Sequence, residues 1–274
     1  MRSEAAAGYA GIVLAAGGGT RIGHHHSKVY LPLAGRPMLA WSLQLLWQAP
    51  GVERLVLAAR EEELELAAGV VARELPGVPV ELVSGGRSRH ESEYRALARL
   101  AADIRAGRVA AVLVHDAARP LASPALTERV LDAALRRGAA VPAVPADSIV
   151  GVDAGGRLSP AGAERLVTIQ TPQAFRAGPL LEAHDAAARD RFAGTDTAAC
   201  VERYSELEVV VVPGDPGNLK VTFPDDLLVA ERLLTRPGGA AAGAGARHSG
   251  PAGDGVRSFP ENPPRWATSG SMPS

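Results

Sequence analysis

Short apolar runs alternate with amphipathic helical patterns along the first half of the chain, and this alternation limits what the chain can fold into. The clearest run, 110–114 (AAVLV), is continuously apolar, as expected for a parallel strand covered on both faces. Similar runs lie at 11–16, 55–59, 78–83 and 139–144. Four or five β-α repeats in under 150 residues predict an α/β fold with a doubly wound, mostly parallel sheet.

Helix signals fill the intervals between these predicted strands. Pro37 precedes an apolar face at helical spacing, and the acidic residues 61–63 suit the start of a second helix. A polar helix is predicted at 88–100. Pro124 begins a fourth helix, which Gly138 ends as a C-terminal cap.

The alternation changes after residue 146. The glycine-rich stretch 147–162 predicts a hairpin that turns at 154–156, so a protruding β-arm is expected over about 147–169. Further predicted elements are a helix at 180–191, a helix capped by Thr195 and Asp196, a strand at 208–212 and a helix at 224–235.

A change of composition separates the domain, 1–235, from the tail. Residues 236–274 are rich in Gly, Ala and Pro and show no apolar periodicity. Such a segment cannot bury enough surface to offset its ordering entropy, so the tail is predicted to be disordered.

Three glycines, Gly17 to Gly19, follow the first predicted strand directly. Glycines can turn successive backbone N–H groups into a concavity that holds phosphate oxygens. Arg21 and Lys28 come next and could bind an anion. The loop is not a Walker A loop, because no Gly-Lys-Ser/Thr follows at the required spacing. It is not a Rossmann fingerprint either, because Ile22 stands where the third glycine would be. An anionic, phosphorylated ligand is the functional hypothesis, and a flexible glycine turn is the alternative.

Composition excludes several broad functions. The 29 basic and 30 acidic residues give a net charge of −1, which argues against broad binding of nucleic acid or of a membrane surface. The single cysteine, Cys200, forms no intramolecular disulfide and is interpreted as buried filler. Without a transmembrane run or a signal peptide, a cytoplasmic protein is expected.

Charged and polar groups follow the predicted strands. Because the carboxyl ends of parallel strands share one sheet edge, the loops at 17–28, 85–89 and 116–119 should converge on one cleft. Asp116 could meet a ribose hydroxyl or a metal-bound triphosphate and Arg119 an anion, or the two could simply pair with each other. Lys220 alone would be taken for a surface lysine. Adjacent residues in a loop generally point in different directions, so no metal site is predicted at the consecutive residues His24 to His26.

Several motifs together resemble a known enzyme family. They are LAAGGGTRIGHHHSKVYLPLAGRPML, SGGRSRHES, VLVHDAARP, TIQTPQAF, TDTAACVE and GNLKVTFPDDLLVAE. Their order and spacing are similar, over about 9–235, to 2-C-methyl-D-erythritol 4-phosphate cytidylyltransferases of the non-mevalonate isoprenoid pathway. HDAARP with QTPQ-x-F is specific to this family and to the related ribitol 5-phosphate cytidylyltransferases.

The resemblance implies a Rossmann-like fold whose arm is exchanged in a homodimer. It also implies Mg²⁺-dependent attack of a sugar-alcohol phosphate on the α-phosphate of CTP, with release of pyrophosphate. Mg²⁺ would be bound mainly through the CTP phosphates, and no protein-only metal site is expected.

The resemblance also implies roles for individual residues. Arg21, Lys28 and Lys220 would be catalytic, stabilising charge on the phosphates. Residues that would contact the nucleotide are Ala15, Ala16, Gly17, Gly19, Gly86, Ser92 and Asp116. Residues on the acceptor side would be Arg119, Ser148, Arg165 and Thr171.

Some positions depart from the family pattern. Arg87 follows the double glycine where an acidic or small residue is usual, and Ser27 stands in place of proline before Lys28. The arm arginine that binds the acceptor phosphate falls on Ala163, with Arg165 or Arg157 as possible substitutes. Another polyol phosphate such as ribitol 5-phosphate is therefore an alternative acceptor, and an inactive nucleotide-binding paralogue is a third hypothesis.

Overall fold

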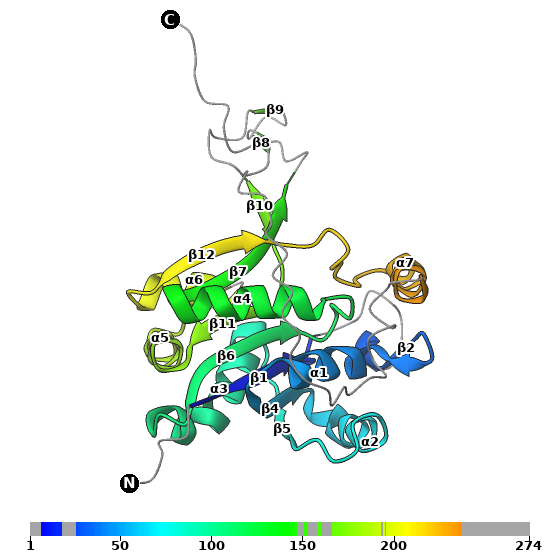
Figure 1. Ribbon diagram of the computed structural model, residues 1–274, viewed down its shortest axis with the longest axis horizontal. Coiled ribbons are helices and arrows are strands. Elements are labelled where there is room, and N and C mark those ends of the chain that lie inside the picture. Colours follow the sequence, from blue (N-terminus) through cyan, green and yellow to red (C-terminus); the bar gives the residue numbers. More distant parts are fainter. Residues whose placement is uncertain are drawn as a thin grey trace, which may run out of the picture. The chain divides into compact units, whose positions relative to one another are not determined.

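The structure is a computed structural model that describes residues 7–17, 26–146, 166–192, 194 and 196–236, and the backbone of 151–152 and 158–159. The described residues form one large sheet of eight strands flanked by helices (Figure 1). The strand order is β10-β7-β11-β6-β1-β4-β5, and β12 pairs with β7. The strands of this sheet are β1 (Gly8–Leu14), β4 (Val52–Ala59), β5 (Val80–Ser84), β6 (Val109–Asp116), β7 (Gly138–Pro145), β10 (Val167–Ile169), β11 (Gln173–Arg176) and β12 (Glu208–Pro213).

Strand directions agree with the predicted α/β class. The pairs β1-β4, β1-β6, β4-β5 and β7-β12 are parallel, whereas β11 runs antiparallel to β6 and β7, and β10 runs antiparallel to β7. The mostly parallel sheet is therefore confirmed. Because the chain moves outward from β1 to β4 and β5 and then returns to β6 on the other side, the sheet has a switch point between β1 and β6.

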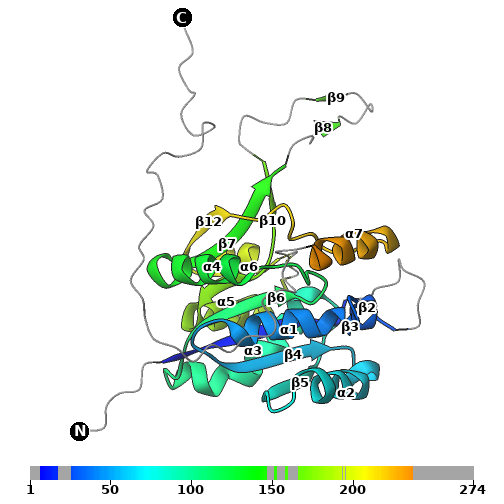
Figure 2. The ribbon, with the colours of Figure 1, turned by 45° about the vertical axis from the view of Figure 1, so that its right-hand side comes forward.

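Helices cover both faces of this sheet (Figures 1 and 2). One layer holds α1 (Met38–Gln48), α2 (Leu64–Glu74), α4 (Pro124–Arg137) and α7 (Pro224–Thr235). The other holds α3 (Arg89–Arg105), α5 (Ala177–Arg189) and α6 (Thr197–Tyr204). Neighbouring strand residues alternate between the two cores, as Val112 and Leu113 do. Both faces are thus apolar, which explains the continuously apolar runs in the sequence.

Capping residues mark helix starts and ends largely where the sequence predicted them. Ser123 Oγ accepts the N–H of Leu126 before α4, and Gly138, with φ of 107°, caps its C-terminus. Asp196 accepts the N–H of Ala199 and begins the helix that carries Cys200. Each cap satisfies a backbone group that the first or last helical turn leaves unpaired.

No element was predicted for the segment that follows the cis peptide Thr171-Pro172, yet it forms the strand β11, antiparallel to β6 and β7. Its short polar run lacks the apolar pattern by which the parallel strands were found. The strand β10, before this peptide bond, lies within the predicted arm range 147–169 and pairs with β7. The first strand also begins at Gly8, earlier than predicted.

The predicted arm is partly described. Strands β8 (Gly151–Val152) and β9 (Leu158–Ser159) pair antiparallel, as a hairpin requires, and its predicted turn at 154–156 lies outside the described residues. The tail 237–274 also lies outside them. Two short strands, β2 (Pro32–Leu33) and β3 (Arg36–Pro37), and the 3-10 helices η2 (Lys28–Tyr30) and η3 (Glu61–Glu63) complete the described elements. Within these parts of the chain, every helix is too short or too polar to cross a bilayer.

Candidate active site

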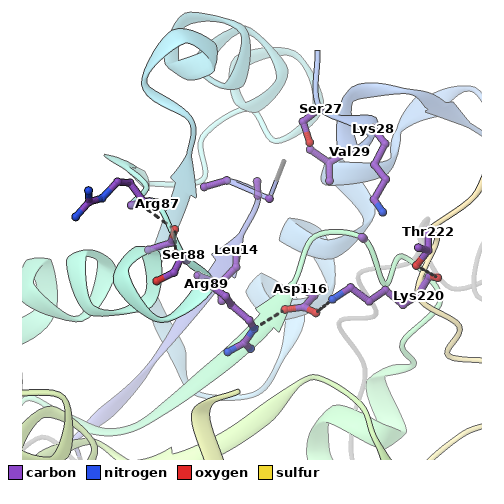
Figure 3. Close-up of a pocket in the computed structure, with 16 residues that line it drawn as sticks. Leu14, Ser27, Lys28, Val29, Arg87, Ser88, Arg89, Asp116, Lys220 and Thr222 are labelled. Carbon is purple, nitrogen blue, oxygen red and sulfur yellow. Dashed lines mark hydrogen bonds and ion pairs between the residues drawn. The ribbon is translucent and has the colours of Figure 1, made fainter. Parts of the chain in front are cut away.

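A cavity of about 630 Å³ opens at the carboxyl ends of β1, β5 and β6, beside the switch point of the sheet (Figure 3). The predicted convergence of these loops is therefore observed, and the size suits a small ligand. Its described lining comprises Leu14, Ala15, Ala16, Gly17, Ser27, Lys28, Val29, Gly86, Arg87, Ser88, Arg89, Ser92, Asp116, Ala118, Lys220 and Thr222. Four of these side chains are cationic and one is anionic, so the cavity is suited to an anion.

The ends of β1 and β5 form a closely packed wall of this cavity. A Cβ atom on Gly85 would overlap the Cβ of Ala16, so only glycine lets the two strand ends approach this closely. Gly86 N–H donates to Ser92 Oγ at 3.0 Å, and Ser92 in turn donates to Ser88 O at 2.8 Å. Of the predicted nucleotide contacts, Ser92 thus links the first turn of α3 to the loop that carries Gly86.

The glycine loop is described only at its two ends. Gly19, Arg21 and the first two histidines of the triplet lie outside the described residues, whereas Gly17 and His26 lie inside them. Arg60 Nη2 donates to Gly17 O at 3.4 Å before the loop. After it, the N–H of Ser27 donates to the buried Glu63 Oε1 at 2.5 Å. Both loop ends are therefore attached to the segment that follows β4.

Lys28 and Lys220 are the only lysines in a chain that has 29 basic residues, and both line the cavity. Lys28 reaches from η2 into the side of the cavity where Lys220 and Thr222 lie (Figure 3). Lys220 Nζ donates to Asp116 Oδ2 at 2.7 Å, so this lysine, whose side chain is 46% exposed, is at once a surface residue and an ion-pair partner in the cavity. Ammonium groups are compact charges, which suits them to phosphate oxygens.

Asp116 lies at the end of β6 between two cations (Figure 3). Besides Lys220, Arg89 Nε donates to Asp116 Oδ1 at 3.2 Å. Burial would raise the pKa of the Asp116 carboxyl, but the charges of Arg89 and then Lys220 outweigh burial and hold this pKa well below its ordinary value. Asp116 is therefore ionised at neutral pH.

Arg119 and Thr171 lie behind Asp116 rather than among the described lining residues. Arg119 donates to the carbonyl oxygens of Asn218, at 2.8 Å, and Ile169, at 3.3 Å, so the alternative of a direct Asp116-Arg119 pair is wrong. Thr171 Oγ1 accepts the N–H of Asp116 at 3.0 Å. Both side chains thus fix the loop that carries Asp116.

His115 completes this support. Burial lowers the pKa of His115 to about 4, so the ring is neutral near pH 7. Its Nε2 lies 3.2 Å from the Arg119 carbonyl and its Nδ1 lies 3.0 Å from Thr171 Oγ1. The carbonyl can only accept, which assigns the proton to Nε2 and leaves Nδ1 to accept from the threonine hydroxyl.

Sequence reasoning missed Arg89 as a site residue, although it lies in one of the loops expected at the cleft. A cation after a second glycine turn, with Glu93 four residues later on a helix, is a readable signal for an ion pair. Ser148 and Arg165, together with Ala163 and Arg157, lie outside the described residues.

Comparisons with known proteins agree with the geometry. The family profile described as 2-C-methyl-D-erythritol 4-phosphate cytidylyltransferase matches residues 10–236. The chain is 43% identical over 227 residues to the protein of that name from Gloeobacter violaceus, covering 81% of this chain and 94% of the relative. It is 42% identical over 234 residues to the one from Cereibacter sphaeroides, covering 84% and 98%.

Solved structures give the same result. The 2-C-methyl-D-erythritol 4-phosphate cytidylyltransferase of Thermus thermophilus is 32% identical, with a TM-score of 0.63 over 83% of this chain and 98% of that one. The 4-diphosphocytidyl-2C-methyl-D-erythritol synthase of Anaerococcus prevotii shares the fold, with a TM-score of 0.72 at 23% identity over 84% of this chain and 97% of that one. This chain belongs to the 2-C-methyl-D-erythritol 4-phosphate cytidylyltransferase family, a family of nucleotidyltransferases.

Proposed function

We propose that this chain transfers the cytidylyl group of CTP to 2-C-methyl-D-erythritol 4-phosphate in the cavity at the ends of β1, β5 and β6. A phosphate oxygen of the acceptor attacks the α-phosphorus of CTP, the bond to the bridging oxygen of the β-phosphate breaks, and pyrophosphate leaves. One observation carries this proposal: among the described residues, four cations and a single carboxylate line the cavity at the switch point. Transfer of this kind depends mainly on positioning and on concentrated positive charge.

The nucleotide occupies the side of the cavity nearest β1 and β5. Backbone groups of Ala15, Ala16 and Gly17 border the triphosphate, and the loop at Gly86 and Ser92 borders the base. Gly19 and Arg21 belong to the same proposal through the family resemblance. Lys28 and Lys220 stabilise the charge that develops on the α-phosphate and on the departing pyrophosphate.

Asp116 fits the magnesium ion that this chemistry implies. It is ionised, it is the one carboxylate among the described lining residues, and each of its oxygens has a further lone pair beyond its bond to Arg89 or Lys220. Mg²⁺ is commonly held by one or two carboxylates together with substrate phosphates. Asp116 would hold the ion together with the CTP phosphates, and the chemistry that the ion would supply is neutralisation of phosphate charge.

The acceptor side rests on fewer contacts. Arg119 and Thr171 act there by holding the Asp116 loop, as their hydrogen bonds indicate. Ser148 and Arg165, from the arm of a second subunit in a homodimer, are proposed to contact the acceptor phosphate. The enzyme is proposed to work in the cytoplasm, and the tail 236–274 to be dispensable.

Pyrophosphate release tests this function directly. Purified protein with CTP and Mg²⁺ is expected to release pyrophosphate when methylerythritol phosphate is the acceptor. With ribitol 5-phosphate, release is expected to be at least 100-fold slower, because a substrate that leaves hydrogen-bonding groups of the site unpaired is rejected by about that factor or more. The reverse preference would identify the other polyol phosphate as the acceptor. Release with neither would support the inactive paralogue.

The same assay separates the tail and the dimer from the chemistry. Protein ending at Thr235 is expected to keep full turnover, and lost turnover would contradict a dispensable tail. Light scattering is expected to give twice the mass of one chain, and a monomer of full activity would contradict arm exchange.

A further inference from the structure

Beneath the cavity, the helices α3, α5 and α6 bury a cluster of polar side chains that the proposed reaction does not use. Glu93 of α3, His184 of α5 and Thr197 of α6 are all 0% exposed, and His90 is 7% exposed. Burying an ionised carboxylate is costly unless it is paired and hydrogen-bonded. This cluster therefore calls for a physical explanation.

A metal site is the first explanation, since donor atoms of His90, His184 and Cys200 lie within 4.8 Å of one another. The ring geometry does not suit one ion. A histidine ligand holds a metal in the plane of its ring, but the rings of His90 and His184 are stacked, with centroids 4.9 Å apart and planes 12° apart. Planes so nearly parallel share no point close to both rings.

The contacts of His184 indicate that its ring belongs to a charged pair instead. His184 Nδ1 lies 3.0 Å from the Leu180 carbonyl, which can only accept, and His184 Nε2 lies 3.3 Å from Glu93 Oε1. Nδ1 therefore carries a proton, and Nε2 lies within ion-pair distance of the carboxylate without being aligned for a hydrogen bond. Burial would lower the pKa of His184, but its contacts with Cys200 and Glu93 outweigh burial and raise it, which keeps the ring cationic.

Glu93 and Thr197 in turn hold the guanidinium of Arg89. Arg89 Nη1 donates to Glu93 Oε2 at 2.9 Å and to Thr197 Oγ1 at 3.1 Å, and Thr197 donates to the same carboxylate oxygen at 2.9 Å. The other edge of this guanidinium, at Nε, donates to Asp116.

Charges thus alternate in an unbroken series from the buried layer to the cavity, His184, Glu93, Arg89, Asp116 and Lys220. The last three are visible side by side in Figure 3. Because a guanidinium is planar and rigid, holding it at Nη1 fixes the direction in which Nε meets Asp116.

We infer that Glu93 is a positioning residue that acts through Arg89 to fix the Asp116 carboxylate for the nucleotide. Without Glu93, Arg89 is free to rotate and to pair with Asp116 through two nitrogens, which competes with the ligand for the carboxylate. This inference rests on the proposed function, because it takes Asp116 as a nucleotide contact.

A double-mutant cycle on CTP affinity tests the inference without requiring turnover. Calorimetry would compare the unsubstituted chain, Glu93→Gln, Asp116→Asn and the double variant, each with CTP and Mg²⁺. Glu93→Gln is expected to weaken binding about fivefold in the native background and less than twofold when Asp116 is already Asn, since interactions through a shared partner are not additive. Equal losses in both backgrounds, or no loss, would overturn the inference.

Two further variants separate positioning from folding. Glu93→Met with His184→Leu removes both buried charges together, which avoids leaving one unpaired and is commonly tolerated. It is expected to fold and to show the same fivefold, Asp116-dependent loss. Adding Thr197→Asp to Glu93→Gln returns a carboxylate to Arg89 Nη1 and is expected to restore affinity to within twofold.

The matched control is Glu128→Gln, which neutralises an exposed glutamate of α4 and is expected to change nothing. If the unsubstituted protein does not bind CTP, or if Asp116→Asn binds it normally, the proposed function fails rather than the inference. If Asp116→Asn weakens binding and the Glu93 variants do not, the inference alone fails.

Discussion

The two helical layers on this sheet bury different kinds of side chain. In the layer of α1, α2, α4 and α7, the buried hydroxyls of Ser42 and Thr127 donate to backbone carbonyls within an otherwise apolar core. In the layer of α3, α5 and α6, Glu93 and His184 are fully buried as an ion pair. Since a buried ion pair is weak support for stability, the difference indicates that the first layer mainly stabilises the fold and the second also serves the site.

Glu63 extends this comparison to the first layer. It is the buried carboxylate on that side, and besides its ion pairs with Arg60 and His26 it accepts the N–H of Ser27, next to Lys28. Buried carboxylates on both sides of the sheet are therefore found where they hold a segment that lines the cavity. Proximity to the cavity, rather than the layer itself, decides where charge is buried.

The largest effect should come from the cavity. Lys28→Ala is expected to lower kcat about 10²- to 10³-fold, because one preorganised positive group facing developing charge contributes that much. The melting midpoint should stay unchanged, as measured by circular dichroism alongside the pyrophosphate assay. A near-normal kcat would remove Lys28 from the mechanism.

The apolar layer should respond in the opposite way. Leu43→Ala in α1 removes a side chain that is 0% exposed and is expected to lower the free energy of unfolding by about 2–5 kcal/mol. Urea denaturation measures this loss. kcat per folded molecule should hardly change, and a large fall in kcat with intact stability would contradict the division between the layers.

Lowering the pH should reveal how much the ionised Asp116 carboxylate contributes to the stability of the fold. The folded pKa of Asp116 lies below its unfolded value of about 3.9, so ionised Asp116 stabilises the fold above that pH and the contribution is lost as pH falls below it. Between pH 5 and pH 2.5, urea midpoints of the native chain should therefore fall more than those of Asp116→Asn. Parallel curves would show that Asp116 contributes no such linkage.

The smallest effect belongs to the surface. Arg137 pairs with Glu208 at 2.7 Å, but both side chains are more than half exposed. Exposed pairs of this kind contribute little, so Arg137→Ala should leave both the urea midpoint and kcat unchanged. A clear loss of activity would mean that charge far from the cavity also matters.

The sequence allowed the fold to be predicted well where local signals suffice. The continuous runs around Val112 and the signals at Pro124, Gly138 and Asp196 identified strands and helix ends within a few residues. The strand after Pro172, β11, was missed because its pairing partners in β6 and β7 are distant in sequence and its own pattern is polar.

The cavity could be predicted only in part. Glycine turns and strand-end charges identified the loops that meet there, and Lys220 came from the family resemblance. The orientation of Arg119 and the link from Arg89 to Glu93 and His184 depend on how α3, α5 and α6 pack, which no local pattern encodes. The roles carried over for Arg21, Ser148 and Arg165 stay predictions.

The placement of the two lysines has a practical consequence for anyone handling this protein. Besides the α-amino group, Lys28 and Lys220 are the only primary amines that the sequence offers. Coupling to an amine-reactive resin, a crosslinker or a dye would therefore be confined to the chain's α-amino group and the two lysines of the cavity instead of being spread over the surface. A bound nucleotide would slow the labelling of these two lysines, so the labelling rate would report whether the cavity is occupied. The arginines elsewhere on the surface would not react with these reagents.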